Sequence, residues 1–273
     1  MIQSHETPDP LQGHPSREWP STPYSDEARA EEPPLETACC IVLLGGCTVS
    51  ASNWPPAMRS ETQLAVRLRR SLPGQPFVVR NLAEAGETAG DFVASGRLSQ
   101  LSKSLPHVDV AFLRYGIADR KKDGVQGCIE NIRRLCELLE RQYPGITLIL
   151  ETDMWVDYPA HYLWDRNTRL APLFDALRAF GSTRGYPIVD IFQLVEAETK
   201  RGNWDLRVRG LPDPEHTILD DSFDPFFADD PAFFTNIHPN SKCLGLIADW
   251  EVAHLKRVLG DRLPNYHYGR SDR

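Results

Sequence analysis

One short stretch of this sequence could deliver a nucleophile to a catalytic site. Four apolar residues, 41–44, are followed by Gly45, Gly46 and then Cys47. A strand that ends in glycines and leads into a helix exposes the next side chain at the carboxyl end of a parallel sheet. A cysteine thiol in that place can attack a carbonyl carbon. The alternative is that Cys47 is a small buried apolar residue, as most free cysteines are.

Three further stretches place polar residues and glycines at the ends of predicted strands or just before the last predicted helix. They are 81–88 (NLAEAGET), 116–119 (GIAD) and 235–240 (TNIHPN). Residues that follow parallel strands collect at one edge of the sheet, so we expect these stretches to meet Cys47 in a common pocket. Taken singly, each stretch is also explained by a turn or a helix cap.

The elements that must position these residues alternate along the chain. Short apolar runs bounded by glycine and proline predict strands, and apolar residues at helical spacing predict helices. The predicted strands are 41–44, 76–82, 108–115, 146–150 and 187–191. The predicted helices are 58–72, 88–105, 125–143, 169–180, a short one that ends at 200, and 241–259. This alternation predicts a three-layer α/β/α fold with a mostly parallel five-stranded sheet.

Two segments interrupt the alternation. Residues 1–37 are polar and acidic and contain seven prolines, so they cannot bury enough apolar area to offset the entropy of ordering. We expect a disordered tail there. Residues 203–234 lack periodicity and carry four prolines and five phenylalanines, which is typical of a lid or of a surface excursion that plugs the core. The expected organisation is one domain, 38–273, with this irregular insertion.

Composition argues against several classes of function. The net charge is −8 and no basic stripe is present, so we expect no nucleic-acid partner. No apolar run approaches the roughly 20 residues of a membrane helix. Six cysteines at irregular spacing favour thiols in a reducing cytosol, so we expect a cytoplasmic protein. Neither zinc-ligand spacing nor a phosphate-binding glycine loop is present, and we expect no metal and no cofactor. The sequence carries no signal for an oligomeric state.

Together, the four stretches resemble the SGNH (GDSL-type) hydrolase superfamily over roughly residues 40–260. The first sequence block of that family is Gly-Asp-Ser, and its serine is the nucleophile. Here the block is Gly45-Gly46-Cys47, so a thiol takes the place of the serine. The second block is Asn-x-Gly-x-x-Gly-x-Thr, whose second glycine donates a backbone N–H to the oxyanion. Asn81, Gly86 and Thr88 match it, and Ala83 replaces the first glycine.

The later blocks of the family depart further from its pattern. The third block is Gly-x-Asn-Asp, whose asparagine is the second oxyanion donor. Gly116 and Asp119 match it, but Ala118 stands where the asparagine should be. The fifth block is Asp-x-x-His-Pro-Asn. The segment His238-Pro239-Asn240 matches it, but Thr235 replaces the aspartate of the catalytic triad.

The resemblance implies a flavodoxin-like fold and acyl-transfer chemistry on a small-molecule acyl ester or thioester. Cys47 is then the nucleophile, His238 the general base, and the backbone N–H groups of Cys47 and Gly86 the donors to the oxyanion. A thiolate–imidazolium pair of Cys47 and His238 lowers the pKa of the thiol and depends less on a third residue than a serine triad does. The resulting thioester passes its acyl group to water or to another acceptor.

Several residues are candidates to support this chemistry. They are Thr235, Asp229, Asp230, Asn81, Asp119 and Arg114. A hydroxyl at 235 orients His238 weakly, and a carboxylate from the irregular insertion could replace the missing aspartate. Arg114 lies two residues before Gly116 and could reach the site from a strand end. The alternative to an enzyme is a catalytically inactive SGNH-like domain used for ligand binding or protein interaction, because three functional residues of the family are changed.

Overall fold

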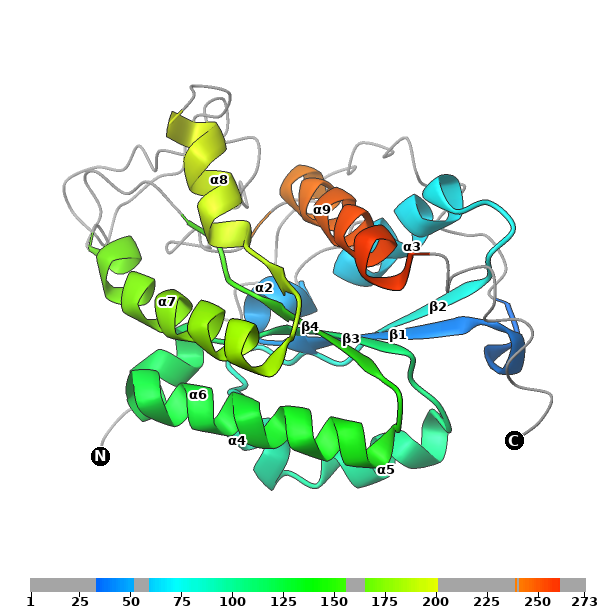
Figure 1. Cartoon of the computed structure of the whole chain (residues 1–273), viewed down its shortest axis with the longest axis horizontal. Helices are drawn as coiled ribbons and strands as arrows, with labels where there is room; N and C mark the ends of the chain where they lie inside the picture. Colours follow the sequence, from blue (N-terminus) through cyan, green and yellow to red (C-terminus); the bar gives the residue numbers. More distant parts are fainter. Residues whose placement is uncertain (1–32, 52–58, 156–164, 201–238, 240, 261–273) are drawn as a thin grey trace, which may run out of the picture.

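The computed structural model describes residues 33–51, 59–155, 165–200, 239 and 241–260. Five parallel strands form one sheet in the order β2-β1-β3-β4-β5, with helices on both faces (Figure 1). The strands are β1 (Cys39–Gly45), β2 (Phe77–Asn81), β3 (Val110–Arg114), β4 (Thr147–Glu151) and β5 (Ile188–Val189). The predicted three-layer α/β/α fold is confirmed. Within the predicted tail, Leu35–Thr37 form a short 3-10 helix; residues 1–32 and the insertion 203–234 lie outside the described part.

The strand β1 is the centre of the arrangement that positions the site. All seven of its residues are buried, because helices cover both faces of a parallel sheet. Its register places Leu43 beside Asn81 of β2 and Gly45 beside Arg114 of β3. The carboxyl ends of these three strands therefore lie level with one another, at the edge where the sequence predicts the site.

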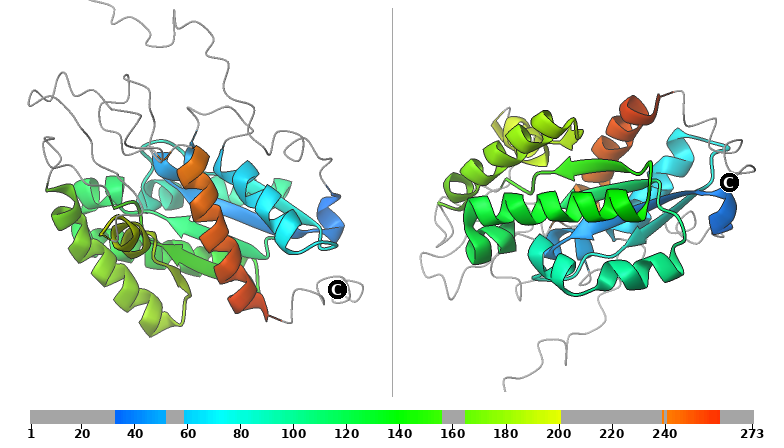
Figure 2. Two further views of the ribbon diagram at one scale, coloured as in Figure 1. Left: turned by 90° about the horizontal axis from the view of Figure 1, so that it is seen from above. Right: turned by 60° about the horizontal axis from the view of Figure 1, so that its bottom comes forward.

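Each face of the sheet has its own apolar core. Alternate β1 residues such as Ile41 face one layer, which contains α3 (Ser60–Ser71) and α9 (Ser241–Leu259). These two helices lie side by side over the sheet (Figure 2). The intervening residues, such as Val42, face the other layer. That layer contains α4 (Ala89–Ala94), α5 (Arg97–Ser104), α6 (Ile117–Gln142) and α7 (Arg166–Arg184). The helix α8 (Ile191–Lys200) packs Val195 on the first core and Phe192 on the second.

Two helices differ from their predicted extents. The segment 88–105 forms two helices, because Gly96 between them adopts a φ of +69° that interrupts helical hydrogen bonding. The helix α6 begins at Ile117, eight residues before the predicted start at 125, and bends at Gly124 where φ is 69° and ψ is −175°. Its first two turns are polar and so lack the apolar spacing that predicts a helix. No helix in the described part of the chain is long and apolar enough to cross a membrane.

Candidate active site

A small pocket lies at the carboxyl edge of the sheet and has Cys47 in its wall. We call it the Cys47 pocket; its volume is about 40 Å³. Its described lining residues are Gly46, Cys47, Thr48, Gly86, Glu87, Arg114, Tyr115, Gly116, Ile117, Ala118, Asp119 and Asp153. The structure thus brings together four residues named from the sequence: Cys47, Gly86, Arg114 and Asp119. Asn81 is described but does not line the pocket, and the remaining candidates Thr235, Asp229, Asp230 and His238 lie outside the described residues.

The glycine that ends β1 fixes the position of Cys47. A Cβ on Gly45 would lie 2.4 Å from the carbonyl oxygen of Arg114 and 2.8 Å from Cγ2 of Val49, so only glycine fits. Cys47 then begins the short helix α2 (Cys47–Ser50), which Ala51 ends with a φ of 44°. All six cysteines lie within the described residues, and Cys47 alone is partly exposed, whereas the other five are buried. The strand, the close approach and the turn together present this one thiol to the pocket.

The described neighbours of Cys47 do not favour its thiolate. Burial raises the pKa of the Cys47 thiol, and the nearby Asp153 carboxylate raises it further. The Arg166 guanidinium and the backbone N–H groups of Cys47 and Thr48 act in the opposite direction but do not reverse the shift. Asp153 is held in place, because it accepts hydrogen bonds from the Thr48 hydroxyl (2.9 Å) and the Met154 N–H (2.7 Å). These described neighbours therefore favour the neutral thiol of Cys47 over its thiolate.

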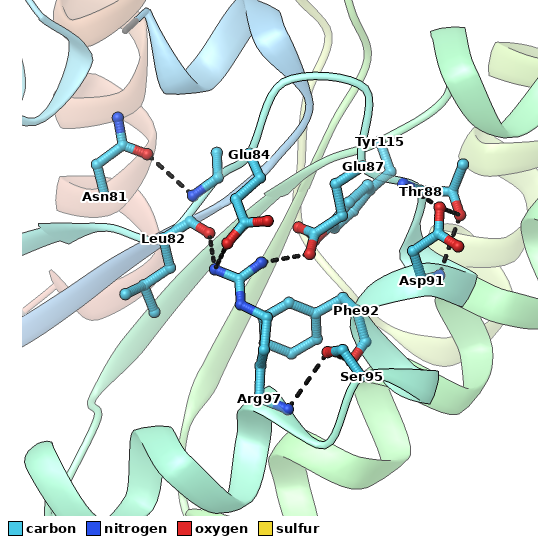
Figure 3. A network of polar contacts seen from close by, with 11 residues as sticks. Asn81, Leu82, Glu84, Glu87, Thr88, Asp91, Phe92, Ser95, Arg97 and Tyr115 are labelled. Atoms are coloured by element: carbon cyan, nitrogen blue, oxygen red, sulfur yellow. Dashed lines mark hydrogen bonds and ion pairs between the residues drawn. The ribbon is translucent and has the colours of Figure 1, made fainter.

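The loop that carries Gly86 is tied to α5 through Arg97 (Figure 3). The Arg97 guanidinium contacts the carboxylates of Glu84 and Glu87 and donates to the carbonyl of Leu82. It also lies 5.1 Å from the centre of the Phe92 ring, a cation–π distance. One cation therefore joins three points of the loop, and Gly86, with a φ of +78°, lies between them.

Polar contacts fix both ends of the same loop. Asn81, at its start, donates to the Val49 carbonyl (2.9 Å) and to Glu61 (2.8 Å), and accepts from the Ala83 N–H (3.2 Å). It therefore holds the end of α2 against the loop. At the other end, Thr88 caps α4 in a reciprocal capping box with Asp91, which is visible in Figure 3.

Asp119 holds main chain rather than substrate. Its side chain is 1% exposed, and its two carboxylate oxygens accept from the N–H groups of Ala89 (2.7 Å) and Gly116 (3.0 Å). These bonds join the start of α4 to the turn before α6. Ala118, which replaces the asparagine of the resembled family, also lines the Cys47 pocket and has no side-chain donor to offer.

A buried charge cluster lies beneath the pocket and was not found from the sequence. Arg114 is 2% exposed; it donates from Nε to Glu151 (3.0 Å) and from Nη2 to Glu251 (2.8 Å), while its Nη1 has no partner among the described residues. Burial raises the pKa of Glu251 well above its usual value, the Glu151 carboxylate raises it further, and Glu251 hydrogen-bonds to Glu151. The protonated form of Glu251 is thus favoured. This cluster connects β3, β4 and α9 under the site.

Among the residues that the structure describes, no three His, Cys, Asp or Glu side chains are grouped to hold a metal ion.

A second residue missed from the sequence is Arg166, the first residue of α7, which is buried and acts electrostatically on Cys47. Neither it nor Glu251 belongs to a motif. Only their burial in three dimensions marks them, because arginine and glutamate are rarely buried without a specific role.

Comparisons with known proteins identify the family and the fold. Residues 44–242 match the model of the GDSL-like Lipase/Acylhydrolase family. Among curated proteins, none matches. The chain is similar to the structure of a member of the lipolytic protein G-D-S-L family from Veillonella parvula, with a TM-score of 0.57 and 13% identity over 81% of this chain and 100% of that one.

Two esterase structures have the same fold. The psychrotrophic esterase EstA from Pseudoalteromonas sp. gives a TM-score of 0.55 and 15% identity, and the match covers 81% of this chain and 99% of that one. A two-domain esterase active on acetylated mannans gives a TM-score of 0.58 and 18% identity, and covers 85% of this chain and 51% of that one. Because the family model spans most of the sequence, this chain belongs to the GDSL-like lipase/acylhydrolase family.

Proposed function

We propose that this protein is an acyl hydrolase or acyltransferase that works through a thioester on Cys47, with His238 as the general base. The observation that carries the proposal is the position of Cys47. It is the partly exposed thiol that follows β1, and it shares a pocket with Gly86. This is where the family places its nucleophilic serine, and the esterase structures of the same fold support a small-molecule ester or thioester as substrate.

The proposed reaction needs a base at the moment of attack. Since the described neighbours raise the pKa of Cys47, the thiol must lose its proton to His238 as Sγ bonds to the acyl carbon. The backbone N–H groups of Cys47 and Gly86 would steady the negative oxygen. The bond from carbon to the leaving oxygen or sulfur then breaks, and the imidazolium returns the proton to that atom. Water or another nucleophile finally releases the acyl group from sulfur.

Acylation by an activated acetyl ester tests this proposal directly. The wild type is mixed with p-nitrophenyl acetate, and the acetyl adduct is followed by mass spectrometry. We expect one adduct on Cys47, slow labelling in His238→Gln and none in Cys47→Ala. Cys128→Ala is the matched control, because Cys128 is buried and its raised pKa makes it unreactive. An adduct that persists in Cys47→Ala overturns the nucleophile assignment.

The second candidate is a catalytically inactive domain that binds a ligand in the Cys47 pocket. Two observations favour it: the described surroundings raise the pKa of the thiol, and Ala118 supplies no oxyanion donor. It predicts no acetyl adduct from any ester, and only a small change in stability on replacing Cys47. A stoichiometric burst of p-nitrophenol in the wild type excludes this candidate.

A further inference from the structure

Arg166 is a buried cation whose two terminal nitrogens have no hydrogen-bond partner in the described part of the chain. Its side chain begins from the first residue of α7 and only 5% of the residue is exposed. Both terminal nitrogens, Nη1 and Nη2, are buried and make no hydrogen bond there. A guanidinium is always charged and carries five N–H donors, so burying it unpaired is costly. Such a group is retained more readily when a ligand supplies the missing hydrogen-bond acceptors.

The start of α7 lies next to the start of α6, whose first residues line the Cys47 pocket. Arg120, in the first turn of α6, donates to the carbonyl of Arg169 (2.7 Å), so the first turns of the two helices are adjacent. Farther along α7, Leu173 and Phe174 approach Gly116, where a Cβ would lie 3.1 Å and 3.3 Å from their side chains. The two helices lie side by side in Figure 1 and begin at the same edge of the sheet. The charge of Arg166 also acts on the sulfur of Cys47.

The described carboxylates around the pocket already have partners. Asp153 binds Thr48 and Met154, while Glu151 and Glu251 bind Arg114. Asp165, next to Arg166, forms its ion pair with Arg169 instead (2.7 Å). None of these carboxylates hydrogen-bonds to Arg166, although the charge of Asp153 also acts on Cys47. The two terminal nitrogens of Arg166 therefore lack an acceptor, and a carboxylate matches the planar fork of a guanidinium.

We propose that Arg166 binds a carboxylate of the substrate beside Cys47. The substrate class is then an acyl ester or thioester that carries a free carboxylate, such as a monoester of a dicarboxylic acid. The acyl part of this assignment rests on the proposed function, whereas the carboxylate site does not.

Two alkylating reagents of nearly equal size test the carboxylate site. Iodoacetate carries a carboxylate and iodoacetamide is its neutral counterpart, and both react with the Cys47 thiolate. We take the rate constant for iodoacetate divided by that for iodoacetamide. The fraction of Cys47 present as thiolate cancels in this ratio, which therefore reports only the preference for the negatively charged reagent. We expect this ratio to fall about tenfold or more in Arg166→Gln, as loss of a charged hydrogen bond requires. Arg169→Gln is the matched control: this side chain is 41% exposed in the same helix, and its variant should keep the wild-type ratio.

Each other outcome has a defined meaning. If Arg166→Gln slows both reagents equally, Arg166 acts on the thiolate and the carboxylate site is refuted. If Cys47 reacts with neither reagent, the proposed function fails, and the site is judged by the melting temperature instead. Sodium acetate should then raise the melting temperature of the wild type and of Arg169→Gln above that in sodium chloride of equal ionic strength, but not that of Arg166→Gln. An equal rise in all three proteins refutes the site.

Discussion

Replacing Glu251 with glutamine tests whether the buried cluster around Arg114 holds a shared proton. Burial and the neighbouring Glu151 raise the pKa of Glu251 well above its usual value. In its protonated form Glu251 can donate to Glu151, and its Oε1 accepts from Arg114 at 2.8 Å. A glutamine amide has the same shape, can donate to Glu151 and can accept from Arg114. We therefore expect Glu251→Gln to keep the contacts with Glu151 and Arg114 and to lose only the group that binds and releases a proton.

The sign of the pH effect follows from the raised pKa. Folded Glu251 keeps a proton at pH values where the unfolded chain, with a pKa of 4.5, has lost it. The stability that this proton confers is complete below that pH and is lost as the pH rises toward the folded pKa. The loss is at most about 1.4 kcal/mol for each pH unit. Across this window Glu251→Gln should gain stability relative to the wild type by that amount per unit.

Urea unfolding at several pH values between about 5 and 8 measures this difference. Glu196→Gln is the control, because Glu196 pairs with Lys200 in α8 and lies outside the buried cluster. Arg114→Met measures how much the whole cluster contributes to stability. Removing one partner of a buried ion pair lowers the free energy of unfolding by about 3–5 kcal/mol. A free-energy difference between Glu251→Gln and the wild type that stays constant with pH refutes the shared proton.

Urea unfolding also checks three smaller changes. Gly45→Ala should lower the free energy of unfolding by about 1–3 kcal/mol, because its Cβ meets the Arg114 carbonyl. In Gly46→Ala the Cβ approaches only the Glu87 carbonyl, at 3.6 Å, so the free energy of unfolding should change by no more than about 0.5 kcal/mol. Equal losses in the two variants contradict the close approach at Gly45. Thr88→Ala should lose about 1 kcal/mol with its capping bond, and an unchanged midpoint argues against the cap. Asn81→Ala should lower the free energy of unfolding by about 1–3 kcal/mol, because it removes the donor to Val49 and Glu61 and the acceptor of the Ala83 N–H; an unchanged midpoint argues against this role.

Most of the fold follows from local patterns in the sequence. The alternation of apolar runs and helical periodicity predicts the five strands and α3, α7, α8 and α9 close to their observed bounds. The misses involve glycine and polar residues. Gly96 divides a predicted helix through its positive φ, and the polar first turns of α6 are held by Asp119 through a bond to Gly116 rather than by apolar packing. Such single contacts leave no periodic trace.

The candidate site divides in the same way. Cys47, Gly86 and Asp119 lie in motifs at strand ends, and the structure places all three at one pocket. Arg166 and Glu251 could not be found, because each is one polar residue in a helix whose other positions are ordinary. Burial distinguishes both residues: the terminal nitrogens of Arg166 are buried without a hydrogen-bond partner among the described residues, and Glu251 is buried against Arg114 of a distant strand. Both properties depend on how the helices pack. The catalytic roles of Cys47 and His238 stay predictions.

The residues that hold the wall of the Cys47 pocket are not the residues that would react there. Asn81 and Asp119 grip main-chain groups of their neighbours, so the shape of the wall depends little on which side chains those neighbours carry. A substitution at Cys47 or Ala118 therefore leaves these contacts in place, so the frame of the pocket does not depend on the side chain at either position.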